Sequence, residues 1–171
     1  MLEKMKTFCY LCKFFVIIVM TEVNFQAVNV SLPPLDVKAV QQWIEKVAAS
    51  HDKRVGRLTY IFCDDEYIIA TNRQYLGHDY YTDIITFDYS TRRRIAGDMV
   101  MSLDTVRSNA AMLNVPYETE LQRVVVHGVL HLCGINDKGP GEREIMERHE
   151  NDALAMIDQP LILHKAENNE V

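Results

Sequence analysis

The chain has 171 residues, of which 48% are hydrophobic and 25% are charged. This length is sufficient for one domain with a substantial core, and this composition excludes a chain that is disordered throughout. The formal net charge of −6 argues against a broad basic surface for nucleic acids, although it does not exclude a small basic cleft. The four cysteines are too few and too irregularly spaced for a disulfide scaffold, so we expect a reduced, cytoplasmic protein.

The N-terminal stretch carries several lysines and then the apolar run 14–20 (FFVIIVM), which superficially imitates a signal peptide. No small-x-small cleavage site follows this run, and it is far shorter than the roughly 20 residues that span a bilayer. We therefore expect translation to begin at Met20 and residues 1–19 to be a spurious or disordered extension. A membrane or export segment and an additional packed element are the alternatives. Cys9 and Cys12 lie in this stretch, and we assign them no role.

Strand-like and helix-like patterns alternate along the rest of the chain. Asp36, the pair Asp64 and Asp65, and Asp104 are candidate helix caps, and Pro116 suits the opening of a helix, where its missing N–H does no harm. Trp43 belongs to an apolar helix stripe and is expected in the core. In chain order, the patterns predict a strand at 23–30, a helix at 36–50, a strand at 57–63, a helix at 64–76, strands at 84–89 and 97–103, and helices at 104–113, 116–133 and 141–157.

This intermingling of strands and helices indicates an α/β or α+β fold. We expect one compact domain over residues 20–162, with a small mixed sheet of about four strands packed by helices, and a polar tail at 163–171. The order of the strands cannot be read from periodicity.

Residues 127–137 (HGVLHLCGIND) are the richest in potential metal ligands. His127 and His131 are four residues apart, so a helix places both imidazoles on one face. Gly134 can end that helix in a left-handed conformation and return Asp137 to the same ion. Three protein ligands leave one position open, as catalytic zinc requires, and zinc lowers the pKa of a water there to about 7. We predict one Zn²⁺ per chain at the end of this long central helix.

Two other residues of this segment bear on the chemistry and the ligands of the site. The general-base glutamate of HExxH peptidases would occupy position 128, which is glycine here, so peptide hydrolysis is disfavoured. Cys133 lies on another side of the helix from His131 and is expected in the core.

Three segments resemble the YbeY-type endoribonucleases, which are metal-dependent factors in bacterial ribosomal RNA maturation. Residues 127–138 (HGVLHLCGINDK) resemble the signature H-G-x-L-H-L-x-G-Y-D-H. Residues 81–87 (YTDIITF) are similar to T-D-V-L-S-F-P, and residues 97–102 (GDMVMS) are similar to G-D-I-x-I-S. The order and separation of the motifs also fit, and the resemblance extends over about residues 55–157.

The resemblance implies a compact α/β sandwich in which Thr82 and Asp83 approach the metal pocket. It suggests Asp83, His127 and His131 as catalytic residues, with a purely capping role for Asp83 as the alternative. His149 is expected at the surface.

The chain departs from the family pattern at three positions. Asp137 replaces the third histidine, and Asn136 stands where the family usually has aspartate. Leu76 replaces the arginine of the motif N-x-x-[YF]-R, an arginine suspected of contacting RNA phosphate. Arg73 or the turn 92–94 is a candidate substitute, although charged turns are commonly just solvated.

The resemblance implies a single-strand-specific endoribonuclease that acts in 16S 3′-end maturation and ribosome quality control. Its partners would be single-stranded RNA, ribosomal RNA in particular, and the small ribosomal subunit or its proteins, without DNA or membrane. The attacking group could be water or the ribose 2′-hydroxyl. A ribosome assembly factor with a structural metal is the main alternative, and a metallopeptidase is the least favoured.

Overall fold

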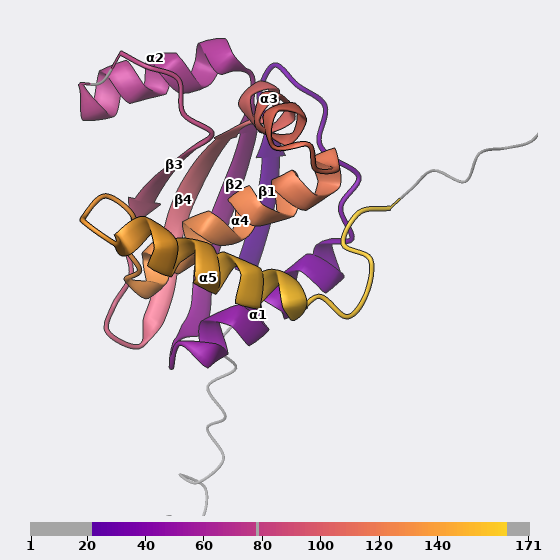
Figure 1. Ribbon diagram of the computed structural model, residues 1–171, viewed down its shortest axis with the longest axis vertical. Coiled ribbons are helices and arrows are strands. Elements are labelled where there is room, and N and C mark those ends of the chain that lie inside the picture. The colour runs from indigo at the N-terminus through magenta and orange to yellow at the C-terminus, as the bar shows by residue number, and fades with distance from the viewer. Residues whose placement is uncertain (1–21, 78, 164–171) are drawn as a thin grey trace, which may run out of the picture.

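Four strands form one mixed sheet in the order β1-β2-β4-β3. Strands β1, β2 and β4 are mutually parallel, and β3 pairs antiparallel with β4 at one edge. The computed structural model describes residues 22–77 and 79–163 (Figure 1). The strands are β1 (Glu22–Ala27), β2 (Arg54–Cys63), β3 (Ile84–Asp88) and β4 (Arg94–Ser102). The expectations for residues 1–19 and for the tail beyond residue 163 concern residues outside this described part.

Five helices connect and cover the strands of the described part. They are α1 (Val37–Ser50), α2 (Asp65–Leu76), α3 (Leu103–Leu113), α4 (Tyr117–Cys133) and α5 (Glu142–Ala155). Helices α1 and α4 lie against the sheet, and α5 packs on the outer side of α4 (Figure 1). The expected α+β domain with a mixed sheet of four strands is therefore confirmed.

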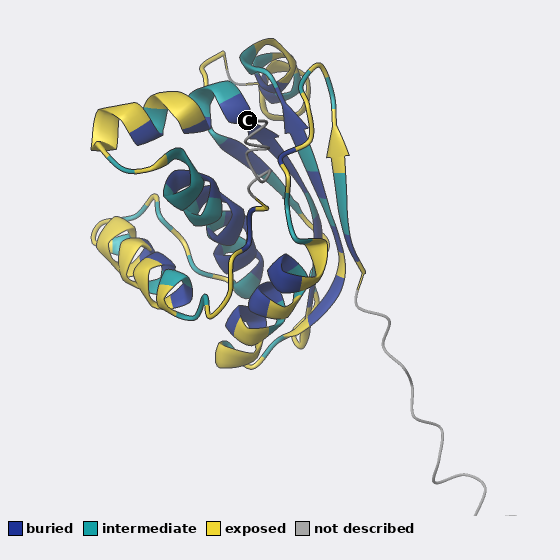
Figure 2. Cartoon of the chain, turned by 90° about the vertical axis from the view of Figure 1, so that its right-hand side faces the viewer, coloured by how far each residue is buried: buried dark blue, intermediate teal, exposed yellow. Residues whose placement is uncertain are grey.

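The two faces of the sheet bury different clusters, as the alternation of side chains along a strand requires. Met99 and Met101 of β4 point into the main core with α1 and α4. Val100, between them, points to the other face and packs with Ile68 of α2 in a smaller cluster. Figure 2 shows that the helices near the sheet turn their buried sides toward it. The outward side of α5 and much of α2 are exposed. Trp43 is in the core as expected, and its indole N–H donates to the Ala153 carbonyl over 2.7 Å.

Several strand boundaries differ from the predicted ones. Strands β2 and β4 each begin three residues earlier than expected, because Arg54 and Arg94 pair with each other across the parallel ladder. A register shift follows Val55, so the alternation there is broken and the pairing is not visible in the sequence. Strand β1 ends at Ala27 rather than Val30, since Asn29 adopts a left-handed conformation with φ of 62°.

The predicted caps of α1 and α2 are confirmed, since Asp36 and Asp64 accept hydrogen bonds from backbone N–H groups in the first turn of each helix. The prediction for α3 was wrong: its cap is Ser102, whose hydroxyl accepts from the Thr105 N–H over 3.2 Å. Asp104 instead lies inside the first turn. Strand β4 therefore passes into α3 without a loop.

Helix α4 positions the candidate site. Pro116 is its N-cap residue, and Gly134 ends it with φ of 97°, a conformation that favours glycine. Its second half lies over β3 and β4, where Gly128 allows close approach. A Cβ at this position would lie 2.9 Å from both Ile84 Cδ1 and Met99 Sδ. No helix within the described ranges is long and apolar enough to cross a membrane.

Candidate metal centre

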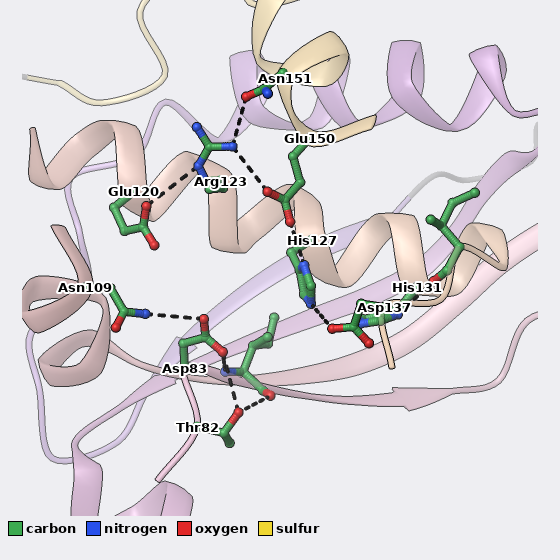
Figure 3. Close-up of polar contacts among 12 residues, drawn as sticks. Thr82, Asp83, Asn109, Glu120, Arg123, His127, His131, Asp137, Glu150 and Asn151 are labelled. Carbon is green, nitrogen blue, oxygen red and sulfur yellow. Dashed lines mark hydrogen bonds and ion pairs between the residues drawn. The ribbon is translucent and has the colours of Figure 1, made fainter. Parts of the chain in front are cut away.

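The structure brings His127, His131 and Asp137 together at the C-terminal end of α4. One donor atom of each residue lies within 4.8 Å of the other two. Asp137 Oδ2 is 3.6 Å from His127 Nε2 and 3.8 Å from His131 Nε2 (Figure 3). The left-handed turn at Gly134 returns the chain so that the aspartate faces both imidazoles.

Each imidazole is held by a hydrogen bond at its other nitrogen. His131 Nδ1 lies 2.9 Å from the Ile135 carbonyl, and since a carbonyl can only accept, Nδ1 carries the hydrogen and Nε2 keeps its lone pair. His127 Nδ1 lies 2.7 Å from Glu150 Oε1 of helix α5. Both Nε2 atoms are thus directed toward Asp137, and in metal sites the ligating histidines likewise donate their other N–H to a carboxylate or a backbone carbonyl.

This arrangement fits a zinc-sized ion. Tetrahedral coordination with ligand distances near 2.0–2.2 Å separates neighbouring donor atoms by about 3.4 Å. The two distances from Asp137 to the histidines, 3.6 and 3.8 Å, are close to that separation. Two imidazole nitrogens and one carboxylate oxygen are donors that zinc accepts, although other divalent ions of the first transition row compete for such ligands.

Arg123 forms an ion pair with the Glu150 oxygen that does not contact His127. Arg123 Nη1 lies 3.2 Å from Glu150 Oε2 and 3.1 Å from the Asn151 side-chain oxygen. Arg123 Nε is also 3.7 Å from Glu120 Oε2, which is beyond hydrogen-bond distance. Burial, together with Asp83 and Glu150, raises the pKa of Glu120, and Arg123 only partly opposes this rise.

The surroundings shift the pKa values of the two histidines in opposite directions. Burial lowers the pKa of His127, but the contact with Glu150 and the charges of Asp83 and Asp137 outweigh it, so the pKa is raised. Burial and then the neighbouring His127 lower the pKa of His131. The lowered pKa favours the neutral form of His131 that can bind a metal, whereas the raised pKa of His127 means that an ion must compete with a proton on that imidazole.

Thr82 and Asp83 approach this centre from the segment before β3, as the family resemblance implied. Asp83 Oδ1 accepts from the Ile84 N–H over 2.8 Å, and Asp83 Oδ2 lies 3.5 Å from Asn109 Nδ2 of α3 (Figure 3). The first bond has the local form of a turn cap, and the carboxylate also lines both pockets with His127. A catalytic role of Asp83 stays a prediction.

Two pockets meet at His127, Asp83 and Asp137. The first, which we call the α2-side pocket, has a volume of about 510 Å³ and is also lined by Leu76, Tyr80, His131 and Lys138. The second, the α5-side pocket, has a volume of about 650 Å³ and is also lined by Asn109, Glu120, Arg123, Arg143 and Glu150. Both volumes are in the range of ligand sites.

Several residues singled out in the sequence lie elsewhere. Cys133 packs against the core, as expected. His149 is half-buried rather than fully at the surface, and its ring lies 5.0 Å from that of His51. Gly128 faces Ile84 and Met99 of the sheet. A side chain at position 128 would therefore meet the sheet, so this helix could not present a general-base glutamate there.

Neither candidate substitute for the family arginine lines a pocket that contains the histidines. Arg73 forms an exposed ion pair with Asp79 over 2.6 Å. Arg93 and Arg94 instead line a separate pocket with Arg54. Leu76, at the position of that arginine, does line the α2-side pocket.

Glu150 is the main residue that sequence reasoning missed. It lies on the buried stripe of α5 with Met146 and Ala153, at spacings of four and three residues. A glutamate within an otherwise apolar stripe requires a buried partner, and this was the available signal.

The fold and the site together define a class: an α+β domain in which two histidines of one helix and an aspartate of the following turn could hold a metal ion. The model of the family described as Endoribonuclease YbeY matches residues 23–158. The chain belongs to the YbeY family.

Relatives support this assignment over most of their length. The chain is 60% identical over 135 residues to Endoribonuclease YbeY of Phocaeicola vulgatus, covering 79% of this chain and 98% of the relative. It is 56% identical over 137 residues to that of Bacteroides fragilis, covering 80% and 99%. The solution structure of a Thermotoga maritima protein shares the fold, with a TM-score of 0.56 and 23% identity over 79% of this chain and 88% of that one.

Proposed function

We propose that this protein is a zinc-dependent endoribonuclease that cleaves single-stranded RNA. The observation that carries the proposal is the cluster of His127, His131 and Asp137, with both imidazoles oriented by second hydrogen bonds, in a chain of the YbeY family. Relatives that are 56–60% identical are named endoribonucleases. The proposed substrate is ribosomal RNA at the 16S 3′ end, in maturation and ribosome quality control in the cytoplasm, with the small ribosomal subunit or its proteins as partner.

In this proposal, His127, His131 and Asp137 would hold the ion. When bound, zinc supplies Lewis acidity and lowers the pKa of a water molecule. Glu150 keeps His127 in the tautomer whose Nε2 lone pair faces the centre. Asp83, whose carboxylate lines both pockets, would accept the proton of the attacking hydroxyl group, from water or from the ribose 2′ position.

The charges of the α2-side pocket make RNA binding depend on the metal. Asp83, Asp88 and Asp137 contribute three negative charges and Lys138 one positive charge, which gives −2 when both histidines are neutral. A divalent ion brings this sum to zero. Because phosphate is repelled by an uncompensated acidic pocket, we expect the metal-free protein to bind RNA poorly.

The test is cleavage of an end-labelled single-stranded RNA by the full-length chain, stripped with a chelator and reloaded with zinc. We expect cleavage by the reloaded protein, its loss in His131→Ala, and its retention in His149→Ala, which removes a histidine outside the centre. Thermal melting of each variant identifies any that fail to fold. Equal cleavage by the wild type and His131→Ala would point to a contaminating nuclease and contradict the proposal.

The products of the same reaction identify the group that attacks the phosphorus atom. A 2′,3′-cyclic phosphate end indicates attack by the 2′-hydroxyl, whereas its absence from the earliest products indicates attack by water.

A second candidate is a ribosome assembly factor with a structural metal. The net charge of −6 and the acidic pocket favour it, since both weaken contact with RNA phosphates. Stoichiometric zinc without any RNA cleavage would favour this function.

A further inference from the structure

We propose that the α2-side pocket is a subsite for one unstacked nucleotide of single-stranded RNA. Its base would lie on Leu76 and Tyr80, and its phosphate would face Lys138 and the metal ligands. This inference rests on the proposed function and names the feature of the substrate that the site selects.

The pocket has two chemically different sides. Leu76 ends helix α2, and Tyr80 lies in the segment that leads from α2 to β3 (Figure 1). His131, Asp137 and Lys138 come from the end of α4 and the turn that follows it. An apolar and aromatic side thus shares one cavity of about 510 Å³ with a charged side that contains the candidate metal centre. A nucleotide has the same two parts, a flat base and an anionic phosphate.

The aromatic side is accessible and firmly supported. Tyr80 is 55% exposed and Leu76 is 48% exposed, so both side chains can be reached from solvent. The segment that carries Tyr80 is tied to α2, because the Asn72 side-chain amide donates to the Tyr80 carbonyl over 2.9 Å. Asn72 is almost completely buried. The backbone that carries Tyr80 is therefore anchored, and a tyrosine ring is a surface on which bases stack in single-strand binding sites.

Lys138 supplies the cation on the charged side. It directly follows Asp137, is exposed, and forms no ion pair or hydrogen bond with another residue of the described part. Within that part, it is the one lysine or arginine that lines the α2-side pocket. Its ammonium group can therefore pair with a phosphate without breaking an existing contact.

A pocket with one side for the base and another for the phosphate favours single-stranded over double-stranded RNA. A base that lies on Tyr80 while its phosphate reaches Lys138 must leave the stack of its own strand, and a duplex opposes this by pairing and stacking. Every base has a π-face, so stacking on tyrosine discriminates little between bases. We infer selection for unpaired nucleotides with weak preference for base identity.

The test measures binding of the full-length, zinc-loaded protein to 2′-O-methyl single-stranded oligonucleotides by fluorescence anisotropy, with a gel to show that they remain intact. In a series in which one nucleotide at a time is abasic, the wild type should lose about tenfold in affinity at one position. Tyr80→Ala should bind the unmodified strand about tenfold more weakly than the wild type does. On the strand that is abasic at the sensitive position, Tyr80→Ala and the wild type should bind with equal affinity. Tyr80→Phe should bind like the wild type, and so should Tyr81→Ala, which removes an exposed ring outside the pocket.

The lysine has a separate readout. Lys138→Ala should weaken binding and reduce the slope of log affinity against log salt by about 0.7, the value for one phosphate contact on a single strand. Lys138→Arg should restore the slope, and Lys38→Ala on α1 should leave it unchanged.

The outcomes separate this inference from the proposed function. The subsite would be overturned if Tyr80→Ala and Tyr81→Ala bound RNA with equal affinity and no position of the abasic series were sensitive. The nuclease proposal would still stand if the wild type cleaved RNA. The predicted Tyr80 and abasic pattern in a protein that cleaves no RNA would support the subsite and overturn the nuclease.

Discussion

The Glu150 carboxylate lies 2.7 Å from Nδ1 of His127, across the interface between α5 and α4. His127 presents its other nitrogen to Asp137 over 3.6 Å. Helix α5 therefore belongs to the candidate metal centre although it provides no ligand. This contact links the packing of α5 on α4 to the orientation of the imidazole.

This contact predicts that Glu150→Gln weakens metal binding without unfolding the protein. A glutamine keeps an acceptor for the His127 N–H but removes the charge that makes the imidazole a better donor. We expect zinc affinity, measured by competition with a chromophoric chelator, to fall about 10- to 100-fold. Glu144→Gln on the exposed side of α5 serves as the control and should match the wild type. An unchanged affinity in Glu150→Gln would show that the contact does not tune the site.

A second prediction concerns the aspartate at the position of the family's third histidine. Asp137→His keeps a legitimate zinc ligand and removes one negative charge from the α2-side pocket. One zinc per chain should still bind, and RNA should bind more tightly, most clearly at low salt, where charges are least screened. Asp137→Ala loses the ligand and should bind zinc less well than either protein. Metal analysis and RNA anisotropy on the three proteins test this ordering, which equal zinc affinities would contradict.

Gly97 of β4 gives a prediction about stability. A Cβ at this position would lie 2.5 Å from the Phe87 carbonyl oxygen and 3.0 Å from Leu132 Cδ2 of α4. Because a backbone oxygen cannot swing away, Gly97→Ala should lower the free energy of unfolding by about 1–3 kcal/mol. At Gly139 the atoms nearest to a new Cβ belong to the Glu142 side chain, which can turn aside at the cost of its hydrogen bond from the Gly139 N–H, so Gly139→Ala is the milder control. Urea denaturation of both variants would refute this account if their midpoints shifted equally.

The pair of His51 and His149 predicts a pH dependence of stability. Burial, followed by the charge of His149, lowers the pKa of His51, and Asp52 opposes this only in part. A histidine with a lowered folded-state pKa contributes stability above its unfolded value of about 6.5, and this stability is lost as the pH falls through the folded-state pKa. The melting temperature should therefore fall between pH 7.5 and 5.5, and less steeply in His149→Gln. Both proteins are measured with chelator present, so that the metal ligands contribute equally. Parallel curves would contradict the predicted repulsion.

The candidate ligands could be found from the sequence because their geometry is local. Two histidines one helical turn apart and a glycine that reverses the chain before Asp137 are relationships within eleven residues of one segment. The caps at Asp36 and Asp64 were predictable for the same reason, since each depends on its own first turn.

The features that escaped sequence reasoning depend on contacts between distant segments. Strands β2 and β4 extend to Arg54 and Arg94 because these residues pair with each other, 40 positions apart in the chain. The meeting of Glu150 and His127 depends on how α5 docks on α4. Ser102 was missed as a cap because it is also the last residue of a strand that passes directly into a helix.

We propose that His127, His131 and Asp137 hold one catalytic zinc ion. The decisive measurement is anomalous diffraction at the zinc edge from crystals of the full-length protein grown with zinc. We expect one strong peak per chain within about 2.0–2.2 Å of both histidine Nε2 atoms and of an Asp137 carboxylate oxygen. A crystal that has zinc elsewhere and none between these three residues would contradict the account.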